Sequence, residues 1–351
     1  MWQHRYRLVC AFVALFITPY LISSLTAADP ATQPLIQFGD LSYLGAFRLP
    51  DQLMNNDGFS IGGYPIAFNA ARNSLYVTSR AGRTAEVAIP SLVNSNNILQ
   101  LQFATFLQGF YDTTEGTMPQ VSSDGGASLS GLLVRGDRLY GSANIYYDAN
   151  NVQRVSHYSH STTLSQPGVS GMRQVWEDQK TGFVSGYMAT VPDEWQALLG
   201  GPAITGQCCI PVTWRTSWGP SAFAFNPDNV NSMAKVPATP LLYYPQEHPT
   251  LGIWEKSDPT YGGTTQIMGV AILAGTRTAL YFGRNGTGAW CYGNGTSDQS
   301  LVGTRGSDGA IYCFDPTSTA KGQHAYPYNY QIWAYDLNEF AAVKALSLIH
   351  I

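Results

Sequence analysis

The most regular part of the hydrophobic pattern lies between Gln266 and Phe340. Four short apolar runs, rich in β-branched and aromatic residues, are separated there by Gly, Asn, Asp and Pro. Runs this short are typical of strands, because a packed helix needs a longer periodic segment. The pattern therefore predicts four antiparallel strands in one sheet, at 267–273, 279–282, 310–314 and 330–335.

A second regularity is a Leu-Tyr pair that follows a turn and is preceded by another short apolar run. This arrangement occurs at 65–77, 131–141, 222–244 and 270–282. It predicts four hairpins, and because their spacing varies, the repeat is degenerate and carries insertions.

The hairpins divide the chain into successive sheets, with a lone strand at 44–49 that is expected to complete the last of them. The first three sheets are expected over 65–112, 130–190 and 221–256, and the first has its third strand at 85–89 and its outer strand at 99–103. The clearest helix is 192–200, where Pro and acidic residues open the first turn and Gly closes it. An irregular insertion then runs through Pro220.

Both ends of the chain differ from the rest. Residues 1–28 combine a basic start, an apolar run and small residues before Asp29, which predicts a secretory signal peptide; the alternative is an uncleaved membrane anchor. Residues 346–351 match the translation of a transposon end used in sequencing-library preparation, so we interpret them as an artefact rather than a natural apolar C-terminus. We therefore expect a single domain over 29–345, truncated at its C-terminal end, in a secreted or extracytoplasmic protein without a membrane span after cleavage.

The charge balance argues against nucleic acid as a partner. The chain has 19 basic and 23 acidic residues, and loss of Arg5 and Arg7 with the signal peptide lowers the basic count to 17, a net charge of −6. No basic stripe is available to neutralise phosphates.

Four cysteines remain after residue 28, and an even number in a secreted chain favours disulfides. Three pairings are possible. Cys291 and Cys313 lie on the two sides of one loop, so their pairing is geometrically natural, and it leaves Cys208 to pair with Cys209. A metal site is the weaker interpretation, because no Cys-x-x-Cys pair is present.

Candidate acid/base residues are scattered. Glu247, His248 and His324 are the candidates for catalysis, because carboxylates and imidazoles transfer protons near neutral pH. His157 and His160 are three apart, which places them on opposite faces of a strand, so we expect no metal site there.

Aromatic residues are abundant in the predicted loops: Trp214, Trp218, Trp254, Trp290, Tyr326 and Tyr328. Aromatic faces stack on the C–H faces of sugars, while an arginine fork binds hydroxyls or a carboxylate. We therefore expect Trp214, Arg215 and Trp218 in the insertion to bind a neutral glycan or glycoconjugate, with no cofactor. The alternatives are a glycosidase or polysaccharide lyase on the same face, and a structural adhesion scaffold.

Over residues 36–345 the strand runs and repeated hairpins resemble β-propeller repeat proteins in general. The resemblance implies an all-β fold built from four-stranded antiparallel blades, with irregular insertions in the loops at the two faces. Trp333-Ala-Tyr-Asp336 is similar to the end of a WD repeat, and a vicinal disulfide on a propeller is similar to the quinoprotein alcohol dehydrogenases, whose tryptophan-docking repeats are not visible here.

Overall fold

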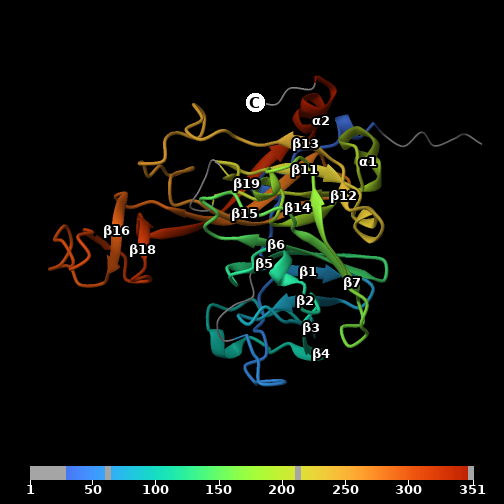
Figure 1. Cartoon of the computed structure of the whole chain (residues 1–351), viewed down its shortest axis with the longest axis horizontal. Helices are drawn as coiled ribbons and strands as arrows, with labels where there is room; N and C mark the ends of the chain where they lie inside the picture. The colour runs from blue at the N-terminus through green and yellow to red at the C-terminus, as the bar shows by residue number, and fades with distance from the viewer. Residues whose placement is uncertain (1–28, 60–64, 210–214, 347–351) are drawn as a thin grey trace, which may run out of the picture.

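The computed structural model describes residues 29–59, 65–209 and 215–346. The fold is mostly β, with 37% strand and 12% helix, and it contains several antiparallel sheets, some of them four-stranded (Figure 1). The predicted signal peptide and the last five residues lie outside the described residues. No described helix has the length and apolar character needed to cross a membrane.

The first sheet is a simple meander of four strands. It consists of β1 (Ile66–Asn69), β2 (Ser74–Thr78), β3 (Thr84–Ala88) and β4 (Thr105–Tyr111), in that order. Successive side chains of a strand point to opposite faces, and one face of β1 is buried: Ala67 and Asn69 point into the protein, whereas Ile66 and Phe68 are exposed. The first hairpin and the third strand are thus confirmed, but 99–103 is not the outer strand, because β4 begins only at Thr105.

The second sheet repeats the meander and gains a fifth strand. β5 (Ala127–Arg135), β6 (Arg138–Ile145), β7 (His157–Ser161) and β8 (Ser170–Val175) pair antiparallel, and β12 (Lys235–Val236) adds to β8 in parallel. The third sheet contains β9 (Met188–Thr190), β10 (Ala203–Thr205), β11 (Ala222–Phe225) and β13 (Ala238–Leu242). It therefore begins before the predicted start at residue 221.

The helix α1 (Asp193–Leu199) lies between β9 and β10, as the sequence predicts. Asp193 and Glu194 occupy its first turn, and Gly200 ends it in a left-handed conformation with φ of 95°. Its Trp195 is fully buried and donates from Nε1 to the Thr276 carbonyl at 3.0 Å. The helix is thereby fastened to the fourth sheet.

The fourth sheet has three strands: β14 (Gln266–Ile272), β15 (Thr278–Gly286) and β19 (Tyr328–Asp336). A separate small sheet of β16 (Cys291–Thr296), β17 (Tyr312–Phe314) and β18 (Lys321–His324) is inserted between β15 and β19. The prediction that 310–314 is a strand of the same sheet as 267–273 is therefore wrong. A second helix, α2 (Leu337–Leu346), follows β19 and was not expected.

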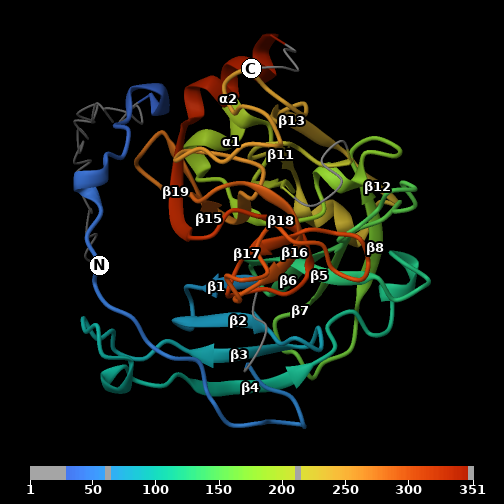
Figure 2. The same ribbon diagram turned by 90° about the vertical axis from the view of Figure 1, so that its left-hand side faces the viewer.

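Short 3₁₀ helices occupy several connections: η1 (Pro30–Thr32), η2 (Phe38–Asp40), η3 (Ile98–Gln100), η4 (Met118–Gln120), η5 (Thr181–Phe183) and η7 (Pro227–Asn231). The predicted lone strand at 44–49 does not join the last sheet. Ala46 forms an isolated bridge with Val93, and Arg48 with Phe103, both beside the first sheet. Upstream, the Arg277 backbone N–H donates to the Pro34 carbonyl, so the N-terminal segment runs from the fourth sheet to the first (Figure 2).

The four large sheets pack one after another through their first strands, β1 against β5, β5 against β9 and β9 against β14. Apolar clusters fill the space between neighbours, around Leu139 between the first and second sheets, Phe223 between the second and third, and Tyr281 between the third and fourth. The first strands, together with parts of β15 and β19, also line a mostly apolar channel of about 1160 Å³, where Phe68 of β1 and Phe282 of β15 are among the exposed side chains.

Candidate functional site

A cleft of about 410 Å³, here called the aromatic cleft, lies between the small sheet and the loops of the larger sheets. It collects side chains from segments far apart in the chain, between Tyr146 and Tyr328. Its aromatic residues are Tyr146, Tyr147, Trp218, Trp254, Tyr261, Tyr292 and Tyr328, and its polar ones include Gln266, Arg284, Lys321 and Gln323. This composition of ring faces with a few polar groups is typical of a small-molecule site.

The antiparallel registers explain why these segments meet. Tyr146 follows β6, whose last residue Ile145 pairs with the first residue of β5, while Gln266 starts β14 and pairs with Arg284. Loops at the start of each sheet's first strand therefore gather at one end of the molecule. The small sheet projects from that end (Figure 1) and lies in front of it when viewed face on (Figure 2).

The base of the cleft is formed by the insertion that the sequence singles out. A disulfide joins the neighbours Cys208 and Cys209, whose Cα atoms are 3.7 Å apart, and Cys209 has a φ of 64°. The Tyr261 hydroxyl lies 3.1 Å from Cys209 Sγ and donates to the Trp218 carbonyl. Trp218 is 2% exposed, and its Nε1 is buried without a hydrogen-bond partner among the described residues.

One wall of the cleft is held by a chain of polar contacts. The Arg284 guanidinium stands 4.5 Å from the centre of the Tyr328 ring, and its Nε donates to Gln266 Oε1 at 3.1 Å. The Tyr328 hydroxyl donates to Asp315 Oδ2 at 2.7 Å. Burial, followed by this carboxylate, raises the pKa of Tyr328 to about 12. The phenol is therefore a fixed neutral group at ordinary pH.

The small sheet supplies the opposite wall. Tyr292 is 50% exposed, so its ring is available to a ligand. The Gln323 side chain lies between Trp254 and Gly263, and the amide orientation that satisfies both accepts from Trp254 Nε1 and donates to the Gly263 carbonyl. Lys321 Nζ lies 3.6 Å from Asp308 Oδ2, which pairs its charge.

The predicted contact set is only partly found at this cleft. Trp214 lies outside the described residues. Trp218 lines the cleft, but its ring packs edge-on against Tyr261 and it is too deeply buried to act as a stacking platform. Arg215 does not line the cleft; its Nη2 donates to the Ala149 carbonyl at 3.3 Å, so it holds the loop that carries Tyr146 and Tyr147.

The predicted acid/base residues are not brought to the cleft. Glu247 and His248 lie in the loop after β13, where Glu247 has a φ of 58° and the His248 ring packs on Tyr244. His324 is 3% exposed in β18. Its Nδ1 faces Asp315 Oδ2 at 2.8 Å and its Nε2 faces the Ala320 carbonyl at 3.0 Å, so both ring nitrogens are engaged in holding the small sheet.

Asp315 connects His324 of the small sheet with Tyr328 in the wall of the cleft. Burial alone would raise the pKa of its carboxyl, but hydrogen bonds from Thr317, His324 and Tyr328 together outweigh burial and lower the pKa to about 2. The carboxylate is thus charged over the whole ordinary pH range and orients both a wall of the cleft and the small sheet.

The small sheet is also closed by the disulfide that the sequence favours. Cys291 of β16 and Cys313 of β17 are bonded with their Cα atoms 5.7 Å apart, which confirms this pairing. Within the described parts of the chain, no three His, Cys, Asp or Glu side chains are grouped closely enough to hold a metal ion.

Several cleft residues were not expected from the sequence. Tyr146, Tyr147 and Tyr292 occur in strands or turns where an aromatic residue commonly packs, and Arg284 lies near the end of β15, just after the apolar run. The predicted loop aromatics Trp254 and Tyr328 do line the cleft, whereas Trp290 and Tyr326 do not. The remaining cleft residues could be predicted only by knowing which strand ends lie together in the folded protein.

The chain matches no protein-family model, and a search of curated proteins finds no significant match.

Proposed function

We propose that this protein is a secreted or extracytoplasmic binding protein that holds a neutral glycan or glycoconjugate in the aromatic cleft. The observation that carries the proposal is the composition of the cleft: Tyr292, Trp254 and the pair Tyr146 and Tyr147 surround a few fixed polar groups. A sugar ring offers C–H faces for stacking, and its hydroxyls need hydrogen-bond partners.

The cations in the cleft support a neutral ligand over a charged one. Arg284 is occupied by the Tyr328 ring and by Gln266, and Lys321 is paired with Asp308. Side chains held in this way present fixed N–H groups to hydroxyls, and the charge of Lys321 is paired. The buried Trp218 N–H, which has no hydrogen-bond partner among the described residues, adds a donor at the base of the cleft.

We also propose that the four large sheets are consecutive blades of a β-propeller. Their successive face-to-face packing and the channel lined by the first strand of each sheet support this interpretation. On this view the aromatic cleft lies on the loop face of the ring, where insertions collect, and the small sheet is such an insertion.

Catalysis on the same face is the alternative, as a glycosidase or polysaccharide lyase, and a structural scaffold is the third interpretation. The positions of Glu247, His248 and His324 favour binding over catalysis, because His324 holds the small sheet and the other two lie in a different loop. Fold alone does not decide among these functions.

The test is a glycan array, followed by titration calorimetry with any glycan that binds. We expect Tyr292→Ala and Trp254→Ala each to weaken binding roughly tenfold, because each removes a stacking face. The matched control is Tyr330→Ala, since Tyr330 is 93% exposed and lies outside the cleft. Absence of any glycan ligand, or equal binding by all three variants and the wild type, would refute the proposal.

A further inference from the structure

The last strand of the fourth sheet, β19, is a long edge strand that pairs on one side only. Its nine residues, Tyr328–Asp336, pair with β15 at every position without a register shift. Within the described part of the chain no strand pairs with its other side, which forms the margin of the sheet (Figure 2). Natural edge strands are commonly protected by Pro, Lys, bulges or shortness, and β19 has none of these features.

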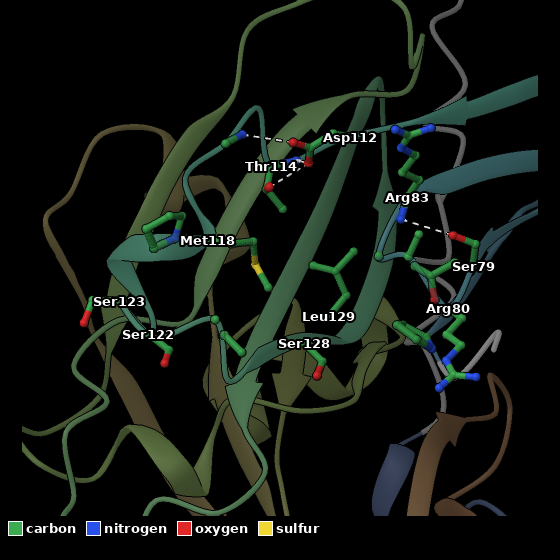
Figure 3. A pocket seen from close by; sticks show the side chains of 18 residues that line it. Ser79, Arg80, Arg83, Asp112, Thr114, Met118, Ser122, Ser123, Ser128 and Leu129 are labelled. Atoms are coloured by element: carbon green, nitrogen blue, oxygen red, sulfur yellow. Dashed lines mark hydrogen bonds between the residues drawn. The ribbon is translucent and has the colours of Figure 1, made fainter. Parts of the chain in front are cut away.

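The last strands of the other large sheets are all interrupted. In the first sheet the register of β4 shifts twice against β3, and directly after β4 the Asp112 carboxylate accepts from Thr114 and Gly116, which turns the chain away from the sheet (Figure 3). In the second sheet β12 has two residues, one of them Lys235. In the third sheet β13 contains Pro240 and a register shift. Among the large sheets of the described chain, the fourth is therefore the one with a continuous, uncharged outer edge.

The hydrogen-bond pattern shows which backbone groups of β19 point outward. The Leu337 N–H donates to the Arg277 carbonyl at 2.9 Å, and these two residues face each other one position beyond the paired strands. Bonded positions alternate in an antiparallel pair, so the odd-numbered residues of β19 bond to β15 and the even-numbered ones direct their N–H and C=O groups away from it. Tyr330, Ile332 and Ala334 thus present backbone groups that have no hydrogen-bond partner among the described residues.

This edge is accessible and is held in an extended conformation. Tyr330 is 93% exposed, Ile332 is 49% exposed, and Ala334 is exposed as well. Trp333 points to the opposite face, where its Nε1 donates to the Thr260 carbonyl at 2.9 Å. Pairing with β15 and contacts of this kind fix the strand before a partner arrives, which lowers the entropic cost of adding another strand to it.

We propose that β19 is a dimerisation edge, which pairs antiparallel with β19 of a second copy of this chain about a twofold axis at Ile332. Ile332 is the central residue of β19, so this register pairs the strand over its whole length. It also places outward-pointing backbone groups opposite each other, Ile332 against Ile332 and Tyr330 against Ala334. The two fourth sheets then form one continuous sheet, and the same surface serves both copies, as a twofold interface requires. The proposal does not depend on the glycan site.

Side-chain size and charge favour the same register. Tyr330 of one copy faces the small Ala334 of the other, so its ring covers a methyl group rather than a second ring. Asp336 comes to lie opposite Tyr328 of the other copy, and the Arg284 guanidinium stands 4.5 Å from the centre of that ring. Opposite charges are therefore neighbours across the axis and like charges do not face each other, which stabilises a cross-strand pair.

Analytical ultracentrifugation of the whole protein tests the proposal. We expect a reversible equilibrium between monomer and dimer, in which the dimer fraction rises with protein concentration. Ile332→Lys places two like charges opposite each other at the axis and should weaken the dimer by roughly tenfold or more. The matched control is Ile98→Lys, because Ile98 is 62% exposed in η3, and this variant should leave the equilibrium unchanged.

Further variants test the register itself. Ala334→Pro removes an outward N–H without disturbing the pairing with β15, so it should also weaken the dimer. Ile332→Cys should form a covalent dimer on mild oxidation, because the Cα atoms of opposed, bonded residues lie about 5.5 Å apart, within disulfide reach. Ala334→Cys is its control and should not cross-link, since Ala334 faces Tyr330. The four described native cysteines are already paired with one another and do not compete.

Thermal unfolding verifies that each variant is folded, as expected for substitutions at exposed positions. The proposal is overturned by a monomer at every concentration, by an equilibrium that Ile332→Lys does not change, or by cross-linking of Ala334→Cys in place of Ile332→Cys. A protein that stays monomeric while an extended segment of another protein binds along β19 would also overturn it, because the edge would then serve a different partner.

Discussion

Buried polar side chains fasten the sheets together, and they are the residues whose roles are hardest to predict from the sequence. Glu86 occupies an ordinary strand position, yet it is fully buried and accepts from Ser74 and Gln108 while Arg72 lies 3.0 Å away. His157 is equally buried, and its two ring nitrogens meet Ser156 of its own sheet and Thr205 of the third. The alternation of side chains along a strand predicts which face such a residue occupies, but its hydrogen-bond partners come from segments far away in the sequence.

His157 predicts a pH dependence of stability. Burial lowers its pKa from 6.5 to about 3, so the folded protein keeps the ring neutral while the unfolded chain takes up a proton below pH 6.5. The stability that His157 contributes is therefore complete above pH 6.5 and is lost as pH falls toward 3, by at most about 1.4 kcal/mol per pH unit.

Urea unfolding at pH values from 4.5 to 7.5 measures this effect. His157→Gln should be less stable than the wild type at pH 7.5, by about 1 to 3 kcal/mol, because it disturbs buried hydrogen bonds, but its stability should fall less steeply with acid. His248→Gln, in a loop after β13, serves as the control and should keep the wild-type slope. An identical slope in His157→Gln would show that another group is responsible.

At the scale of elements, hairpins were predictable and the association of sheets was not. The four Leu-Tyr hairpins pair as β1–β2, β5–β6, β11–β13 and β14–β15. In three of them a short loop leaves adjacent apolar runs few other partners, whereas β11 and β13 pair across a longer connection that carries η7 and β12. The run at 310–314 is indeed a strand, but periodicity does not identify its neighbour, and it joins the small sheet. In α2 the spacing of Leu337, Phe340 and Val343 matches one buried helix face, a signal too short to separate from a strand end.

The small sheet depends on its disulfide, since Cys291 and Cys313 are 22 positions apart and enclose most of it. The double variant Cys291→Ser with Cys313→Ser is expected to lose about 3 kcal/mol of unfolding free energy, because the unfolded chain regains the entropy of an open loop. Hydrogen exchange should increase first in β16 and β18, and glycan affinity should fall because Tyr292 and Gln323 lose their support.

The vicinal pair provides a comparison within the same chain. Cys208→Ser with Cys209→Ser removes a bond between adjacent residues, which encloses almost no loop, so the entropic loss should be much smaller. A larger loss of stability from this variant than from the 291–313 variant would contradict the loop-entropy explanation.

At the scale of the whole molecule, the aromatic cleft arises from the arrangement of the sheets, which no single segment of the sequence specifies. Successive antiparallel sheets bring the turns at one end of each sheet together, so the aromatic cleft draws on loops of three large sheets and on the small sheet. The sequence indicated Cys209, Trp218, Trp254 and Tyr328 through composition alone.

At this scale, the packed faces of the sheets differ from the face that lines the open channel. Two glycines show the difference. A side chain at Gly131 of β5 would collide with the Gly186 carbonyl beside β9, whereas a side chain at Gly269 of β14 has nothing within 4 Å. Both glycines lie in the first strand of a sheet, and neither has a positive φ.

Gly131→Ala is therefore expected to destabilise the protein by roughly 1 to 3 kcal/mol, because the second and third sheets must separate to admit the methyl group. Gly269→Ala should be neutral or slightly stabilising, since it restricts only the unfolded chain. Thermal unfolding of the two variants compares a packed sheet interface directly with the channel. Equal losses in both variants would contradict the assignment of Gly269 to an open face of the fourth sheet.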